Sequence, residues 1–293
     1  MTSYRIEHTT TYTYDVEVTG SYGQFHLRPR DLPWQTCLAH EIVIEPEPAD
    51  LFRHTDLYGN TKAYFHVVRP HTTLVVTGIS IVEVERAELD PAALALPWEQ
   101  ARPHWRPEEP DSWEATDFTF PSPYVEIPPG MAEYVHSSFP AGRPIGEAAV
   151  ELMQRVNSDF TYKSGSTKVS TKVGDLLRDR TGVCQDFSHF MVSALRSLGL
   201  AGRYVSGYLA TRTTPGRPRL VGADASHAWV GCWIPGAGWL YLDPTNRRVI
   251  DESHATVAWG RDYGDVPPVK GVIFTEAKKS TLKVEVDVAP VLP

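Results

Sequence analysis

The sequence predicts an α+β fold, in which a small β-rich domain precedes a larger core of helices and antiparallel strands. Three observations support this prediction. Residues 1–86 alternate β-branched and aromatic residues with turn signals, residues 87–130 are rich in proline, and helical periodicity begins only in residues 131–293. A chain of 293 residues is long enough for two domains and a connecting segment.

Residues 1–86 are expected to form a small β-sandwich or a barrel-like domain. Several short strands separated by turns are typical of these folds. The runs that predict strands, all rich in Thr, Val, Ile and Tyr, cover residues 4–14, 40–45, 63–68 and 72–84. No chemical motif appears in this domain.

Residues 87–130 are expected to connect the two domains. Proline recurs along the segment, interleaved with acidic residues and tryptophans. Proline removes a backbone donor and resists both helices and central strands, so regular structure is not expected to dominate here. The tryptophans and phenylalanines predict that the segment packs along a surface.

Two helices are expected early in the core. Residues 147–159 carry apolar side chains at roughly helical spacing. A second helix is expected to begin near Cys184, because a one-sided apolar stripe runs from Phe187 to Leu198. Gly199 then supplies its C-cap.

Strands are expected in the rest of the core. They are predicted over residues 202–209, 226–234 and 239–242. The tail over 282–288 alternates apolar and charged residues, which predicts a half-buried strand that returns to a sheet.

The composition excludes several classes of partner. The formal net charge is −8 and no basic patch is evident, so we expect no nucleic-acid partner. No apolar stretch is long enough to cross a bilayer, and no signal peptide is visible, so we expect no membrane partner. Three widely spaced cysteines, Cys37, Cys184 and Cys232, fit a reducing compartment and predict a cytoplasmic protein.

Cys184 stands where a helix is expected to begin. Thr181-Gly182-Val183 precedes it, and the apolar stripe starts three residues later. The free N–H groups of a first helical turn favour an anion, so they favour a thiolate there and can hold the oxyanion of a tetrahedral intermediate. Taken alone, a buried cysteine at the start of a core helix would be an ordinary structural feature.

His227 and Asp243 lie on two neighbouring predicted strands. The connection over 235–238 is short, so the strands form a hairpin that places the two residues side by side. Pro244 restricts the backbone of Asp243 to the extended region. Each residue alone has an ordinary structural explanation, but a cysteine, a histidine and an aspartate in this order can form a Cys–His–Asp triad.

The core also resembles a known family, the bacterial transglutaminase-like superfamily, which includes proteins provisionally classed as cysteine proteases. The match covers roughly residues 155–275. The N-terminal strands are similar to the β-domain that precedes the core in one bacterial branch. The segments that carry the resemblance of the core are residues 182–187, 195–208, 226–230, 238–246 and 259–268.

The resemblance implies a papain-like α+β core with Cys184 as nucleophile, His227 as its base and Asp243 as the residue that orients the histidine. It places the second oxyanion donor upstream, where Tyr162 is the candidate; a packing aromatic before a loop is the alternative for this residue. No Cys/His grouping has the spacing of a zinc site, and no phosphate loop or dinucleotide fingerprint is present, so we expect no metal and no cofactor.

The predicted function is cleavage or acyl transfer at a peptide or carboxamide bond, through a thioester on Cys184. A peptide or protein substrate is expected, and hydrolysis is favoured over cross-linking because nothing indicates a lysine-binding site. Two alternatives stay open. One is a thioester-dependent acetyltransferase, although the paired glycines that precede the cysteine in arylamine acetyltransferases are absent. The other is a peptide- or protein-binding module that keeps the fold without activity.

Overall fold

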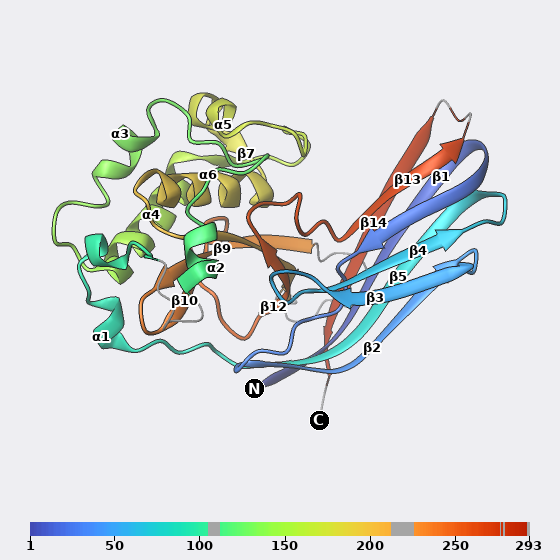
Figure 1. Ribbon diagram of the computed structural model, residues 1–293, viewed down its shortest axis with the longest axis horizontal. Helices are drawn as coiled ribbons and strands as arrows, with labels where there is room; N and C mark the ends of the chain where they lie inside the picture. The colour runs from blue at the N-terminus through green and yellow to red at the C-terminus, as the bar shows by residue number, and fades with distance from the viewer. Residues whose placement is uncertain (105–111, 212–225, 276, 278, 292–293) are drawn as a thin grey trace, which may run out of the picture.

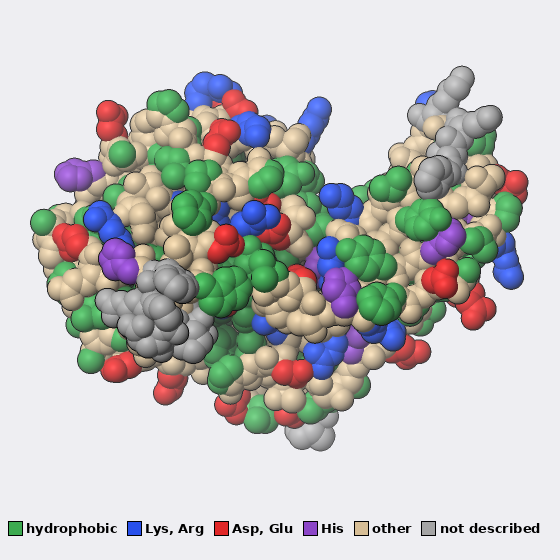
Figure 2. All heavy atoms as spheres, viewed as in Figure 1, with side chains coloured by type: hydrophobic (Ala, Val, Ile, Leu, Met, Phe, Trp, Pro, Cys, Tyr) green, Lys and Arg blue, Asp and Glu red, His purple; other side chains and the backbone are tan. Residues whose placement is uncertain are grey.

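The computed structural model describes residues 1–104, 112–211, 226–275, 277 and 279–291. Figure 1 shows two lobes, a long β-sheet on one side and a mixed lobe of helices and strands on the other. The space-filling view shows a hollow between the tops of the two lobes (Figure 2). No helix in the described part of the chain is long and apolar enough to cross a membrane.

The N-terminal lobe is one curled antiparallel sheet rather than two packed sheets. The order is β2-β5-β1-β4-β3, and β13 and β14 also pair with β1. The strands of this sheet are β1 (Thr2–Phe25), β2 (Gln35–Glu45), β3 (Asp50–Thr55), β4 (Thr61–Val67), β5 (His71–Val84), β13 (Val269–Thr275) and β14 (Ser280–Pro290). The strand expected over 282–288 therefore returns to the N-terminal sheet.

Strand β1 is long enough to organise the whole sheet. Its first half pairs with β5 on one side and β14 on the other, so that Ile6 lies opposite both Ser80 and Val288. Its last residues pair with β4 and β13, so that Gly23 lies opposite Phe65 and Gly271. The first and last segments of the chain thereby form one structural unit.

The connecting segment contains short helices and packs against the core, as its aromatic residues predict. Trp98 and Phe118 are buried, whereas Trp113 and Phe120 are exposed; Trp105 lies outside the described residues. The helices of this segment and the next are α1 (Pro91–Leu94), the 3-10 turn η1 (Trp98–Ala101), α2 (Ser112–Asp117) and α3 (Met131–His136).

The core has a five-stranded antiparallel sheet in the order β11-β10-β9-β8-β12, with α6 against β8 and β9. Strands β6 and β7 form a separate parallel pair. The elements are α4 (Ile145–Asp159), β6 (Thr161–Tyr162), α5 (Val173–Asp179), β7 (Thr181–Gly182), α6 (Cys184–Ser197), β8 (Gly202–Leu209), β9 (Ser226–Ile234), β10 (Gly238–Asp243), β11 (Arg248–Val249) and β12 (His254–Gly260). The expected helices and core strands are thus confirmed.

Helix α6 is the central element of this lobe. Its apolar stripe is fully buried, with Phe187, Phe190 and Leu195 each at most 1% exposed. The stripe packs on one face of the sheet, together with Val230 of β9. The helix ends at Ser197 with Leu198 as its C-cap. Gly199, expected as the C-cap, is the next residue; it has φ of +73° and donates its N–H to the Arg196 carbonyl at 2.9 Å.

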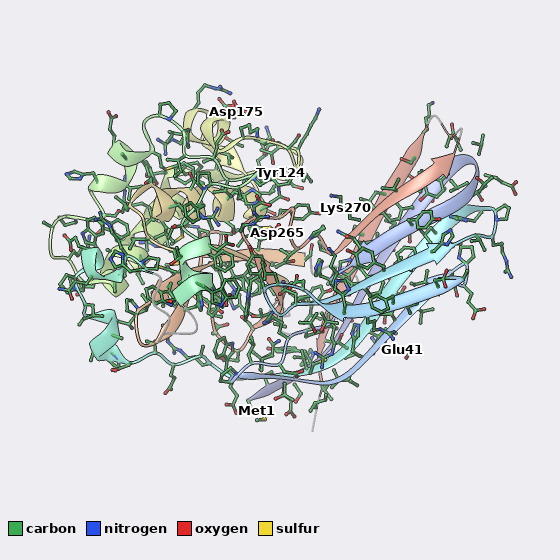
Figure 3. The ribbon with its side chains drawn as sticks, in the orientation of Figure 1. Met1, Glu41, Tyr124, Asp175, Asp265 and Lys270 are labelled. Carbon is green, nitrogen blue, oxygen red and sulfur yellow. The ribbon has the colours of Figure 1, made fainter. Side chains whose placement is uncertain are left out.

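The two lobes are joined along the free edge of β12. The Gln35 side-chain amide donates to the Thr256 carbonyl and accepts from the Thr256 N–H, both at 2.7 Å. The Asn60 amide pairs in the same way with Trp259, at 2.8 and 3.0 Å. These buried side chains satisfy backbone groups that an edge strand otherwise leaves open. Figure 3 labels Asp265 and Lys270 beside this junction.

Candidate active site

Cys184 is the first residue of α6 and is separated from the short strand β7 only by Val183, the N-cap of the helix. Tyr162 pairs with Gly182 in the parallel β6–β7 ladder, which fixes the approach of the chain to the helix. A Cβ on Gly182 would lie 2.8 Å from the Asp186 Cβ and 3.0 Å from Leu176 Cδ2. Glycine is needed here because of this close packing, and not because of a left-handed turn.

Asp186 caps the start of the same helix. Its Oδ2 accepts from the Val183 N–H at 2.8 Å and from the Thr167 hydroxyl at 2.6 Å. Burial raises the pKa of Asp186, although these two hydrogen bonds act in the opposite direction. Asp186 therefore serves the helix as a cap.

His227 and Asp243 come together at one end of the sheet. His227 is the second residue of β9 and Asp243 is the last of β10, and these strands pair in a hairpin. His227 Nε2 lies 2.8 Å from Asp243 Oδ2. The carboxylate is completely buried and the imidazole is 9% exposed, so water screens this pair weakly.

Cys184 lies beside the His227 imidazole, close enough for the thiol and the ring to interact and raise the pKa of His227. Since Nε2 of His227 is taken by Asp243, Nδ1 is the nitrogen left for the sulfur. Burial lowers the pKa of His227, but the hydrogen bonds and charges of Asp243 and Cys184 outweigh it and raise that pKa to about 10. The three residues singled out from the sequence thus meet in one site, with a histidine that is readily protonated.

Asp243 accepts more hydrogen bonds than the triad requires. Its Oδ2 also accepts from the Asn246 side-chain amide at 2.7 Å, and its Oδ1 accepts from the backbone N–H groups of Thr245 and Asn246 at 2.9 and 3.1 Å. Burial raises the pKa of this carboxyl, yet its donors reverse the effect and hold it well below the usual range. Asp243 is therefore fixed in orientation and ionised.

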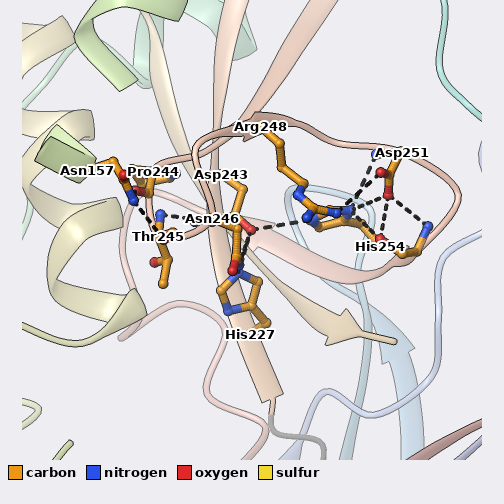
Figure 4. A network of polar contacts seen from close by, with 10 residues as sticks. Asn157, His227, Asp243, Pro244, Thr245, Asn246, Arg248, Asp251 and His254 are labelled. Atoms are coloured by element: carbon orange, nitrogen blue, oxygen red, sulfur yellow. Dashed lines mark hydrogen bonds and ion pairs between the residues drawn. The ribbon is translucent and has the colours of Figure 1, made fainter. Parts of the chain in front are cut away.

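A second histidine, His254, also reaches Asp243. It is the first residue of β12 and its Nε2 lies 3.3 Å from Asp243 Oδ2, while its Nδ1 lies 3.1 Å from Asp251 Oδ1. Figure 4 shows the resulting line of side chains from His227 through Asp243 and His254 to Asp251. Sequence reasoning missed His254 and Asp251, because no motif links them to the triad; Asn246 lies within a segment that carries the family resemblance.

The other candidates have less direct relations to the site. Tyr162 is 54% exposed. Partial burial and the nearby charge of Cys184 both raise the pKa of Tyr162, which places the two side chains close together. Cys232 is fully buried, which raises its pKa to about 12. No group of three or more His, Cys, Asp or Glu side chains within the described ranges is arranged to hold a metal ion.

Two family models match the chain. The bacterial transglutaminase-like N-terminal region matches residues 4–83, and the transglutaminase-like superfamily matches residues 134–244. A solved structure from Cytophaga hutchinsonii, provisionally named a cysteine protease, has a TM-score of 0.75 at 19% identity and covers 100% of this chain and 91% of its own. This likeness shows a shared fold.

Relatives by sequence point to the same family. An uncharacterised protein of Mycobacterium tuberculosis is 46% identical over 98% of this chain and 92% of its own length. Another from Mycobacterium leprae is 33% identical, with 92% coverage of both chains. A protein-glutamine gamma-glutamyltransferase of Pseudomonas aeruginosa is 38% identical over 99 residues, which are 32% of this chain and 15% of that protein. The chain belongs to the transglutaminase-like superfamily, a membership that supports cysteine-dependent acyl transfer or hydrolysis as its general chemistry.

Proposed function

We propose that this protein hydrolyses a peptide or carboxamide bond through a thioester on Cys184. The observation that carries the proposal is the thiol at the start of α6, beside His227, whose Nε2 lies 2.8 Å from a buried Asp243 carboxylate. A protonated imidazole beside a thiol at a helix N-terminus favours the thiolate, which is the reactive form.

In the first half-reaction, the Cys184 sulfur attacks the carbonyl carbon of the substrate. The carbonyl oxygen becomes an oxyanion, which the free N–H groups of the first turn of α6 are placed to stabilise. The His227 imidazolium gives its proton to the leaving nitrogen, the C–N bond breaks, and an amine or ammonia departs. Asp243 keeps the imidazole oriented throughout.

In the second half-reaction, water attacks the thioester carbon. The now neutral His227 takes a proton from that water, the C–S bond breaks, and the carboxylic acid product and the thiolate–imidazolium pair are restored. We propose water as the main acceptor because it needs no binding site of its own, whereas transfer requires a second site that holds an amine. Tyr162, exposed and near Cys184, is our proposed second donor to the oxyanion.

The experiment compares the wild type with Cys184→Ala and the reference variant Cys37→Ala on a peptide and protein library. Mass spectrometry distinguishes backbone cleavage, deamidation of glutamine and incorporation of an added primary amine. We expect turnover in the wild type and in C37A, loss in C184A, and more hydrolysis than amine incorporation. Turnover of an active substrate that persists in C184A would refute the thioester mechanism, and predominant amine incorporation would refute the preference for hydrolysis.

A measurement without substrate tests the same mechanism. Iodoacetamide labels thiolates, so Cys184 should be labelled selectively below neutral pH. Burial raises the pKa of Cys37 and that of Cys232, to about 12 for Cys232, so both serve as slow internal references. Equal and slow labelling of all three cysteines would contradict an activated nucleophile.

A further inference from the structure

We propose that His254 is a positioning residue of the site, a buried imidazolium that shares the Asp243 carboxylate with His227 and links it to Asp251. The proposal rests on the proposed function, because it concerns how the charge of His227 is set. His254 has a side-chain exposure of 0%, and each of its ring nitrogens faces a carboxylate.

The geometry favours the charged form of His254. A neutral imidazole carries one N–H and can donate from one nitrogen only, whereas an imidazolium donates from both. Nε2 lies 3.3 Å from Asp243 Oδ2, and Nδ1 lies 3.1 Å from Asp251 Oδ1. The Asp251 backbone N–H points to Nδ1 as a donor at 3.3 Å and so competes with a proton there, and the Ser253 hydroxyl also lies 3.3 Å from Nδ1. The Asp251 carboxylate oxygen is nearer and charged, which favours a proton on Nδ1.

The surrounding groups agree with this assignment. The titratable side chains that face His254 are Asp243 from β10, His227 from β9 and Asp251 from the preceding loop, and Arg248 contacts the far oxygen of Asp251 at 3.5 Å. Burial lowers the pKa of His254, and the two carboxylates more than reverse this effect. Trp229 packs edge-on against the ring, with centroids 5.4 Å apart, and helps to exclude water.

A second imidazolium on Asp243 has a definite consequence for the site. The His227 and His254 rings are 6.4 Å apart, close enough for their charges to interact appreciably in a buried setting. Both rings donate to the same oxygen, Oδ2, so neither has the full charge of the carboxylate to itself. His254 therefore limits how strongly Asp243 holds the proton on His227, the proton that must reach the leaving group.

The test follows the pH at which iodoacetamide labelling of Cys184 rises, between about pH 3.5 and 8. His254→Gln removes a positive charge and keeps an N–H near the position of Nε2. Asp251→Asn removes a negative charge and keeps the oxygen that accepts from Ser253. Glu252→Gln, an exposed carboxylate in the same loop, is the matched control.

We expect opposite movements in the two variants. Loss of the positive charge should move the labelling midpoint upward by about half a pH unit in H254Q, and loss of the negative charge should move it downward by a similar amount in D251N. E252Q should leave it in place. Midpoints that move in the same direction, or not at all, in variants with wild-type circular dichroism would overturn the proposal.

A direct measurement completes the test. Nitrogen-15 NMR of histidine-labelled wild-type protein distinguishes an imidazolium from either neutral tautomer, and the signal absent from H254Q assigns His254. A neutral His254 at pH 7 would overturn the proposal; if H254Q does not fold, the histidine signal that moves most in D251N and stays in place in E252Q assigns His254. Failure of the proposed function looks different, because Cys184 of the wild type would then be labelled no faster than Cys37.

Discussion

Replacing Asp243 with asparagine tests the electrostatic basis of the site. The pKa of His227 is raised from 6.5 to about 10 by Asp243 and Cys184 against the effect of burial. Each pKa unit corresponds to about 1.4 kcal/mol, so the folded environment as a whole, with burial included, favours the imidazolium by about 5 kcal/mol. The new side chain in Asp243→Asn would keep an oxygen for the backbone N–H groups but present an amide N–H where Oδ2 now accepts from His227 at 2.8 Å.

We expect two effects of D243N. The pKa of His227 should fall, because burial is then opposed by Cys184 alone. The imidazole should also adopt the other tautomer, with Nε2 as acceptor and a proton on Nδ1 facing the sulfur, which prevents it from acting as a base. Turnover should therefore fall by about 10³- to 10⁴-fold.

The assay is the ratio of Cys184 to Cys37 labelling by iodoacetamide at pH 6, read from peptide masses. E252Q again serves as control, since it removes an exposed carboxylate of the neighbouring loop. D243N should lose most of the wild-type ratio and E252Q should retain it. A folded D243N protein that labels Cys184 as selectively as the wild type would refute the electrostatic reasoning.

Three further predictions follow from the same geometry. Because the pKa of His227 is raised in the folded protein, the stability that its protonation contributes is complete below pH 6.5 and declines by about 1.4 kcal/mol per pH unit as pH rises toward 10. The melting temperatures of the wild type and of His227→Gln should therefore converge over this range. A difference in melting temperature that stays constant would contradict the raised pKa. Gly182→Ala places a Cβ 2.8 Å from that of Asp186 and should cost about 1–3 kcal/mol in urea unfolding; an unchanged midpoint would show that the helix start adapts. Tyr162→Phe should lower kcat by about 10²-fold with KM unchanged if the hydroxyl donates to the oxyanion, whereas an unaltered kcat would leave Tyr162 as a packing residue.

Much of the fold was predictable because local patterns and tertiary packing agree. The stripe of α6, its end just before Gly199 and the hairpin of β9 and β10 follow from periodicity and short turns. The pairing of His227 with Asp243 was predictable for the same reason, since two adjacent strands joined by a short turn are a local feature. The single curled sheet was harder to predict, because β14 finds its partner β1 at the other end of the chain.

The network around Asp243 was not predictable from the sequence. Asn246 is close in sequence and lies in the turn after β10, but His254 reaches Asp243 only because the loop after β11 brings the chain back to the opposite edge of the sheet. A histidine at the start of a strand is common and carries no signal of its own. Only the three-dimensional arrangement shows that both of its nitrogens face carboxylates.

The N-terminal lobe has a physical connection to this network. Strand β12, whose first residue is His254, pairs on one side with β8 and on its free edge with the side chains of Gln35 and Asn60. These amides come from the lobe that contains no candidate catalytic residue, and they hold the backbone of β12 at Thr256 and Trp259. Because a strand held on both edges has little freedom to shift, the N-terminal lobe holds in place the strand that carries His254.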